Sequence, residues 1–263
     1  MKIRNAFALA LLLPLMVACK AQDGSADVNP APAPATTEAA PAATDAPEVA
    51  VVEEATVDTA TTAGPIVPPQ GPAPVEGEDF IRIDGGVPFA PDGDKIEVVE
   101  VFGYVCPACF RFQPVLAPWK SRLPADVNFV YVPAVFGGTW DDYARAFYAA
   151  QTLGVLERTH EPLYKAIHLD SKLKGERGRD SIEDIAGFYA TQGVDAKQFQ
   201  AAIASFGVNA QTARAKQFAV RSKISGTPSL IVGGKYLVKG KSYEDMLRIT
   251  DHLIASERAA LGR

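Results

Sequence analysis

A long segment without aromatic residues confines any fold to the later part of this chain. No Phe, Trp or Tyr occurs between Phe7 and Phe80, and ten of the twenty prolines lie in residues 20–75. Ala, Thr, Val and acidic residues make up most of the rest. Such a segment cannot bury enough apolar surface to offset the entropy lost on ordering it. We therefore expect residues 19–78 to form a disordered acidic tether and residues 79–263 to fold.

The net charge also differs between residues 20–75 and the residues that follow them. Eight acids against Lys20 alone give residues 20–75 a net charge of −7, whereas the whole chain carries −5 and two basic residues, Lys2 and Arg4, precede the segment. The remaining residues are therefore neutral overall. A neutral domain has no electrostatic reason to bind nucleic acid, so we expect no nucleic-acid partner.

Residues 1–18 have the pattern of a secretory signal peptide. A basic start precedes the apolar run AFALALLLPLMVA, which is too short to span a bilayer, and Cys19 follows it. The stretch LMVAC resembles the lipobox of bacterial lipoproteins, in which the cysteine is acylated. An ordinary signal peptide with a chance cysteine is the alternative. The resemblance implies a lipid-anchored protein of the periplasm, and Lys20 in place of an aspartate favours the outer membrane.

From about residue 79 the sequence shows strand and helix signals of an α/β domain. Residues 95–102 are apolar apart from Glu97 and Glu100, which is typical of a strand buried on both faces. The other predicted strands are residues 80–83, residues 127–132 and the two arms of TPSLIVGGKYLV, which Gly233-Gly234 joins as a hairpin. A helix is expected from the cysteine pair described below to about Arg122.

The stretch from about 138 to 213 contains only helical signals and is predicted to be a helical insertion. Its predicted helix starts are Asp141, Ser181 and Asp195, and the last two segments are closed by Gly193 and Gly207. A further amphipathic segment runs to about Lys223. Ser242 with Asp245 predicts a capping box at the start of a terminal helix. This order fits one small mixed sheet with a helical insertion.

The stretch VEVFGYVCPACFRF holds Cys106 and Cys109, two of only three cysteines, directly after the buried strand. Cysteines three residues apart on a first helical turn share one face and are close enough for a disulfide. A structural disulfide in so short a ring would add little stability. A zinc site is also disfavoured, because His160, His168 and His252 lack the spacing of a ligand set. Redox exchange explains the pair better than either alternative.

The helix start gives the pair its expected chemistry. Unpaired backbone amides and the helix dipole would favour a thiolate at Cys106 and lower the pKa of its thiol. Pro107 suits the first helical position, where no amide donor is needed. Cys109, one turn deeper, is placed to resolve a mixed disulfide formed at Cys106. We therefore expect no metal and no cofactor, the redox-active group being the Cys106–Cys109 disulfide itself.

Together these features resemble the DsbA family of periplasmic thiol oxidases, which has a thioredoxin-like fold with an inserted helical domain. VEVFGYVCPACFRF, the helical insertion and ISGTPSLIVGGKYLV carry the resemblance, which runs from about Lys95 to the last helix. It implies that Cys106 is the exposed nucleophile and Cys109 the buried resolving cysteine. Pro107 and Ala108 are then the dipeptide between them. Family members commonly have histidine in that dipeptide, so we expect this chain to be a weaker oxidant than those members.

The resemblance also implies roles outside the motif. Pro228 matches a cis-proline that faces the disulfide and, with Thr227, binds the substrate peptide; a trans proline that opens an edge strand is the alternative. Glu100 matches a buried acid that assists proton transfer near the resolving thiol; a solvated strand charge is the alternative. The lysine that partners this acid in the family is missing from the aligned strand, where Val130 stands.

The implied function is donation of a disulfide to reduced or unfolded secreted proteins, with reoxidation by a DsbB-type membrane quinone reductase. A reductase or isomerase of the DsbC type and a non-catalytic lipoprotein scaffold are the alternatives. Isomerases of that type usually dimerise through a folded N-terminal domain, which residues 20–75 cannot form, so a monomeric oxidase is favoured. Candidates for an apolar client-binding surface are Phe102, Tyr104, Val105 and Phe136, with core packing as the alternative for Phe102.

Overall fold

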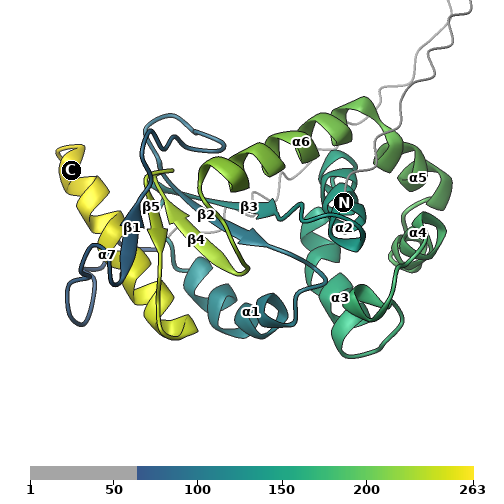
Figure 1. Ribbon diagram of the computed structural model, residues 1–263, viewed down its shortest axis with the longest axis horizontal. Helices are drawn as coiled ribbons and strands as arrows, with labels where there is room; N and C mark the ends of the chain where they lie inside the picture. Colours follow the sequence, from purple (N-terminus) through teal and green to yellow (C-terminus); the bar gives the residue numbers. More distant parts are fainter. Residues whose placement is uncertain (1–63) are drawn as a thin grey trace, which may run out of the picture. The chain divides into compact units, whose positions relative to one another are not determined.

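The computed structural model describes residues 64–263. The predicted signal peptide, Cys19 and most of the predicted tether lie outside the described residues. The described part contains one five-stranded sheet with helices around it (Figure 1). Its strands are β1 (Phe80–Arg82), β2 (Ile96–Phe102), β3 (Val127–Pro133), β4 (Ser229–Val232) and β5 (Tyr236–Val238). Its α-helices are α1 (Pro107–Lys120), α2 (Thr139–Thr152), α3 (Leu156–His168), α4 (Ile182–Thr191), α5 (Ala196–Ala204), α6 (Phe206–Arg221) and α7 (Tyr243–Ala260).

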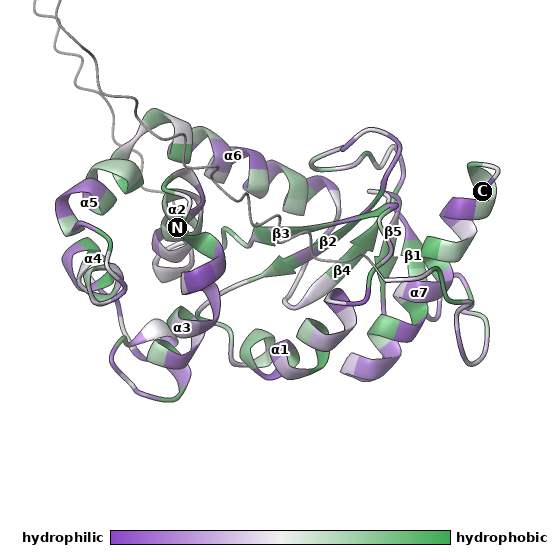
Figure 2. Ribbon diagram, turned by 180° about the vertical axis from the view of Figure 1, so that it is seen from behind, coloured by the Kyte–Doolittle hydropathy of each residue, from purple (hydrophilic) through white to green (hydrophobic). Residues whose placement is uncertain are grey.

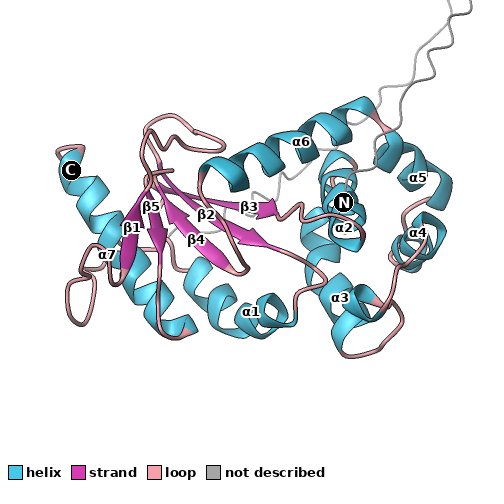
Figure 3. Ribbon diagram, viewed as in Figure 1, coloured by secondary structure: helices cyan, strands magenta, loops and turns pink. Residues whose placement is uncertain are grey.

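The strands follow the order β1-β5-β4-β2-β3, with β2 inside the sheet (Figure 3). β2 pairs in parallel with β3 and antiparallel with β4. Strands on both sides and helices on both faces bury all seven residues of β2. The α/β prediction, with a mixed sheet built around this apolar strand, is confirmed.

The two faces of the sheet have separate apolar cores. Alternate residues of a strand point to opposite faces, so Ile96 and Val98 pack with α1 and α7, and Val99 and Val101 pack with the helices of the insertion. Figure 1 shows α1 and α7 on one side of the sheet and α6 on the other. Figure 2 shows β2 and β3 as largely hydrophobic between these layers. Glu100, two residues after Val98, therefore faces the α1 layer.

The helical insertion consists of α2 to α5 and the first part of α6, which continues to Arg221. The predicted helix end at Gly207 is wrong. Ser205 adopts an extended conformation and its side chain accepts the N–H of Val208, so it starts α6 and leaves Gly207 inside that helix. A side-chain cap at Ser205 satisfies an orphan amide, which outweighs the poor helical propensity of one glycine. Within residues 64–263 no helix has the length and apolar character needed to cross a membrane.

The predicted caps are formed with one difference. Ser181 and Asp184 make a complete capping box at the start of α4. At α7 the Ser242 side chain accepts the N–H of Asp245, as expected. The Asp245 carboxylate, however, accepts the N–H of Lys241 rather than that of Ser242, so the predicted box is only half formed.

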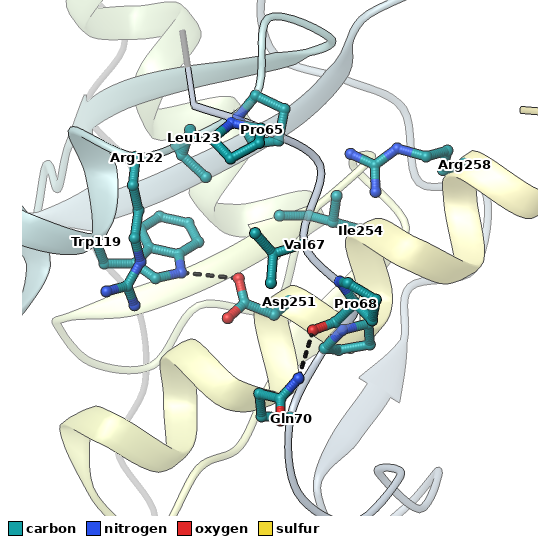
Figure 4. A pocket seen from close by; sticks show the side chains of 12 residues that line it. Pro65, Val67, Pro68, Gln70, Trp119, Arg122, Leu123, Asp251, Ile254 and Arg258 are labelled. Atoms are coloured by element: carbon teal, nitrogen blue, oxygen red, sulfur yellow. Dashed lines mark hydrogen bonds between the residues drawn. The ribbon is translucent and has the colours of Figure 1, made fainter.

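Residues 64–78, the end of the predicted tether, lie against the folded domain. The N–H of Gly64 donates to the carbonyl of Leu123 at 3.0 Å, and the Arg248 guanidinium donates to the carbonyl of Pro72. Figure 4 shows this segment passing over the indole of Trp119 and over α7. Composition indicates that a segment cannot form its own core, but it does not report docking on a surface that another segment has built. The rest of the tether stays a prediction.

Candidate active site

Cys106 starts α1 at the end of a tight turn that leaves β2. Its N–H donates to the carbonyl of Gly103 at 3.1 Å. The residue is the N-cap of α1, and its sulfur accepts the N–H of Cys109 at 3.4 Å. Pro107 is the first residue of the helix, where its missing amide costs nothing. The sequence-predicted placement of the cysteine pair on a helix start is confirmed.

The surroundings of Cys106 stabilise its thiolate. A hydrogen bond from the Cys109 thiol contributes most, and the Thr227 side chain and the amides of Cys109 and Ala108 add to it against the opposing effect of burial. Together they lower the pKa of the Cys106 thiol to about 6. The residue is only 7% exposed, so the expected exposed nucleophile is mostly covered.

Cys109 has the opposite environment. It is fully buried, and burial raises the pKa of its thiol far above the ordinary value, with further contributions from Cys106 and Glu100. Both residues are free thiols in this structure. A thiolate formed at Cys109 would be strongly basic, whereas one at Cys106 is stable at neutral pH, so the two sulfurs are suited to different steps of an exchange reaction.

The Thr227–Pro228 segment faces Cys106. The peptide bond between the two residues is cis, and the carbonyl of Thr227 lies 3.5 Å from the Cys106 sulfur. The trans alternative for Pro228 is therefore wrong. Both residues are partly exposed, so the backbone of this segment is open to a peptide brought up to Cys106.

The dipeptide between the cysteines is held from the last helix. The Tyr243 hydroxyl of α7 donates to the carbonyl of Ala108 at 2.9 Å. Pro107 is exposed and Ala108 is partly exposed. The sequence contained no signal for this contact, because Tyr243 is 135 residues away along the chain. The lower oxidising power expected from Ala108 stays a prediction.

Glu100 is completely buried in the middle of β2. Its register neighbours are Tyr131 on β3 and Leu230 on β4, and α1 covers the face to which it points. The alternative of a solvated strand charge is wrong. Neither carboxyl oxygen has a hydrogen-bond partner within the described protein. Desolvation raises the pKa of Glu100 to about 8, against the opposing influence of Lys120 and Gln113, so the carboxyl is mostly protonated at neutral pH.

The missing lysine is supplied by α1 rather than by the aligned strand. Lys120, in the last turn of α1, donates to the Tyr131 hydroxyl at 3.1 Å, and its ammonium lies 4.8 Å from the centre of that ring. Its charge lowers the pKa of Glu100 and that of His160. No ion pair joins Lys120 to Glu100 among the described residues, so Lys120 moderates the acid without pairing with it, and the expected rise in the pKa of Glu100 through desolvation is confirmed. A search for the lysine at Val130 on the strand could not find a cation that belongs to the helix α1.

Glu97, the other acid of β2, has a structural role. It points to the opposite face from Glu100, and its carboxylate accepts the N–H of Phe89 at 2.6 Å and the N–H of Ala90 at 2.5 Å. These bonds hold the loop before β2 against the sheet. Two acids three residues apart therefore have different functions, because the strand alternation turns them to opposite layers.

A cleft of about 730 Å³ lies beside the buried acid, between α1, β3 and α3. Its lining includes Gln113, Lys120, Tyr131, His160 and Tyr164. The hydroxyl of Tyr104 and Nδ1 of His160 are 2.8 Å apart, and burial lowers the pKa of His160 to about 3, so its ring is neutral. The sequence did not indicate that α3 is a separate helix or that it contributes to this site.

Three of the four candidates for an apolar client surface belong to the core. Phe102, Tyr104 and Val105 are at most 1% exposed, because the turn before Cys106 is packed against the insertion. Phe136 is 46% exposed and packs on Trp140 with the two rings tilted by 47°. Among residues 64–263 no group of three or more His, Cys, Asp or Glu is arranged to hold a metal ion.

Comparison with known families supports this geometry. The model of the DsbA-like thioredoxin domain matches residues 97–250, which include both cysteines, Glu100, the insertion and the cis-proline. The chain belongs to the DsbA family. DsbA of Pseudomonas syringae pv. tomato is 40% identical over 195 residues, covering 73% of this chain and 88% of the relative. DsbA of Pseudomonas aeruginosa is 37% identical over 187 residues, covering 70% of this chain and 86% of the relative.

Solved structures of DsbA proteins share the fold. The oxidoreductase DsbA of Xylella fastidiosa superposes with a TM-score of 0.69 at 44% identity, covering 71% of this chain and 98% of its own. DsbA of Pseudomonas aeruginosa gives a TM-score of 0.66 at 35% identity, covering 72% and 97%. The chain is accordingly a thiol:disulfide oxidoreductase with a thioredoxin-like fold and an inserted helical domain.

The site geometry accounts for an exchange reaction in the direction of substrate oxidation. A substrate thiolate attacks the sulfur of Cys106 in the disulfide, the Cys106–Cys109 bond breaks, and the electron pair stays on Cys109. Because that sulfur is buried and strongly basic, it takes up a proton. Glu100, which the family resemblance implies as the proton donor, is mostly protonated at neutral pH. A second substrate thiolate then attacks the substrate sulfur of the mixed disulfide and releases Cys106 as a thiolate. The substrate loses two electrons and the protein becomes a dithiol.

Proposed function

We propose that this protein donates the Cys106–Cys109 disulfide to reduced or unfolded secreted proteins during oxidative folding, with no metal or other cofactor. The observation that carries the proposal is the stabilised sulfur at the start of α1, which accepts the Cys109 N–H and has its thiol pKa lowered to about 6. A stable thiolate is a good leaving group and favours the dithiol form of the protein, which makes its disulfide an oxidant.

The test asks whether the protein oxidises thiols or reduces disulfides in its substrates. The oxidised protein is mixed with a reduced, unfolded secretory protein, and the free thiols of the substrate are followed with time. We expect their loss with the wild type and none with Cys106→Ser. Activity that depends on an added reductant would instead place the protein with reductases or isomerases of the DsbC type. Absence of exchange in both directions would leave a non-catalytic scaffold, and the relatives, named as interchange proteins, do not favour either alternative.

Substrate peptides would bind along the Thr227–Pro228 segment. The Thr227 carbonyl lies 3.5 Å from the Cys106 sulfur, and an extended peptide can pair with such a backbone group. For regeneration of the disulfide we propose a DsbB-type membrane quinone reductase, as the family implies. An Ala108→His variant should be the stronger oxidant in a redox titration, because a cation beside Cys106 would stabilise its thiolate further.

We place the protein in the periplasm as a monomer, held to a membrane by a lipid on Cys19, with the outer membrane favoured. Support comes from the lipobox-like LMVAC and from Lys20 after the cysteine. A segment as rich in proline as residues 20–63 would let the folded domain work at a distance from its anchor. Metabolic labelling with a fatty acid should mark the wild type and not Cys19→Ser. A wild type that takes up no label would contradict the proposed lipid anchor and would not affect the proposed oxidase activity.

A further inference from the structure

His168, at the end of α3, contacts the active-site motif on both sides of the cysteine pair. Its Nε2 lies 2.7 Å from the carbonyl oxygen of Tyr104, two residues before Cys106. Its ring stacks on Phe110, the residue after Cys109, with the ring centres 5.0 Å apart and the planes inclined by 14°. Tyr164, one turn earlier on α3, also lies against Tyr104 and Phe110, but through its ring alone, whereas His168 adds a hydrogen bond to the backbone of the turn.

The Tyr104 carbonyl needs a donor from outside the turn. Tyr104 is a central residue of the turn that the Cys106 N–H closes on Gly103. In the part of the chain that the structure describes, no backbone N–H outside regular helices and strands donates to this carbonyl, and a buried carbonyl without a partner is costly. Since a carbonyl oxygen only accepts, Nε2 of His168 must carry the proton.

The turn that His168 contacts also carries Cys106. The turn from Gly103 to Cys106 is the only covalent connection between β2 and α1, so its position sets how the Cys106 sulfur meets the first amides of the helix. That sulfur is 3.4 Å from the Cys109 nitrogen, and the strength of this hydrogen bond depends on where the turn holds the sulfur. A small displacement of the turn would therefore weaken the contact that stabilises the thiolate.

We propose that His168 is a positioning residue for the redox pair, which holds the Gly103–Cys106 turn through its Nε2–H bond to Tyr104 and thereby keeps the Cys106 thiolate on the helix start. The helical insertion then contributes, through His168, to the reduction potential of the Cys106–Cys109 couple, which lies on the sheet domain. This inference concerns the couple of the proposed oxidase, and it is independent of the client that the couple serves.

The ring stacking and the hydrogen bond can be separated by substitution. His168→Phe keeps an aromatic ring against Phe110 and removes the donor. His168→Gln places an amide N–H near the position of Nε2 and removes the ring. His252→Phe is the matched control, because Nε2 of His252 also approaches a backbone carbonyl, that of Gln70 at 3.2 Å, on the exposed side of α7.

The measurements are the pKa of the Cys106 thiol in the reduced protein, from the ultraviolet absorbance of the thiolate, and the equilibrium with glutathione at pH 7. We expect His168→Phe to raise the thiol pKa by about one unit and to shift the equilibrium about fivefold toward the oxidised protein. His168→Gln and His252→Phe should stay close to the wild type. Thermal unfolding shows whether each variant is folded, and His168→Met replaces the phenylalanine variant if that one is not.

Two results would overturn the proposal. One is a folded His168→Phe protein with the thiol pKa and glutathione equilibrium of the wild type. The other is a change in His168→Gln as large as that in His168→Phe, which would show that an N–H donor at this position is not sufficient to hold the turn. Neither measurement uses a client protein, so failure of the wild type to oxidise a reduced substrate would contradict the proposed function without deciding the role of His168.

Discussion

Cys106 and Cys109 are the same residue type three positions apart, yet their acid–base properties are opposite. The first sulfur meets backbone amides at the start of α1, and the second lies wholly within the core. Glu100 beneath them is an acid kept neutral by desolvation. At the scale of residues, the site is a set of ordinary groups whose pKa values have been separated by burial and by hydrogen bonds, as proton transfer at neutral pH requires.

The lowered pKa of Cys106 predicts a pH-dependent stability of the reduced protein. A thiol whose pKa falls from 9.0 to about 6 on folding stabilises the folded state fully above pH 9. This contribution declines as the pH falls and is absent below about 6. The difference in unfolding free energy between reduced wild type and reduced Cys106→Ser should follow this course in denaturant titrations. A difference that does not change between pH 5 and 9 would contradict the assigned thiolate.

Glu100→Gln should slow exchange and stabilise the fold. Loss of the proton donor for Cys109 is expected to reduce the rate of substrate oxidation by about tenfold or more. Because burial raises the pKa of the carboxyl from 4.5 to about 8, Glu100 destabilises the folded state increasingly as the pH rises between these values. The variant should therefore be more stable than the wild type by about 3 kcal/mol at pH 7 and equally stable at pH 4. Stopped-flow oxidation assays and denaturant titrations measure the two effects.

At the scale of elements, α1 serves the site at both of its ends. Its first turn presents Cys106, and its last turn brings Lys120 over Tyr131 toward Glu100. The α3 helix closes the same layer with His160 and His168. The cation that moderates the buried acid is thus delivered by a helix of the sheet domain, and the contacts that align the nucleophile come from the insertion.

Lys120→Met should raise the pKa of Glu100 above its value of about 8, because the ammonium of Lys120 favours the charged form of the carboxyl. The change can be followed by NMR titration of the Glu100 side-chain carboxyl. Lys120→Arg keeps the charge and is the control, expected to stay near the wild type. Identical titration of Glu100 in the wild type and the methionine variant would show that Lys120 does not act on the acid.

At the scale of the whole molecule, the segment that enters the domain joins it far from the nucleophile. Gly64 pairs beside Pro124, just after the end of α1, while Cys106 lies at the start of that helix. The segment then runs over Trp119 and α7 (Figure 4). The described residues of this segment therefore lie away from the active-site end of the domain.

Gly64→Ala should detach the beginning of this segment and leave exchange unchanged. An added Cβ would come within 2.0 Å of the Arg122 carbonyl oxygen, which is backbone and cannot move aside cheaply. We expect faster limited proteolysis between residues 64 and 72 and a loss of about 1 kcal/mol in stability. Gly187→Ala, where a Cβ meets nothing within 4 Å, is the control. Unchanged proteolysis would mean that the segment does not depend on this contact.

Much of the fold and part of the site could be predicted from local patterns. The strands, the turn at Gly233-Gly234 and the cap at Ser181 depend on residues close together in the chain, and each was found where expected. The cysteine spacing together with the Thr-Pro pair indicated the redox chemistry. The prediction of a helix end at Gly207 failed because Ser205, two residues earlier, starts the next helix. Which of the two signals prevails depends on which side chain reaches an unpaired amide in the folded structure.

The sequence by itself determined that the protein has a folded redox domain, because a run of apolar residues and a cysteine pair on a helix start depend only on neighbours along the chain. Only the tertiary structure decided which groups surround that pair. Lys120, His168 and Tyr243 come from three different helices and converge on the motif through packing. Contacts between distant segments leave no periodic trace in either segment, and burial, which sets the pKa of Glu100, exists only once those segments have met.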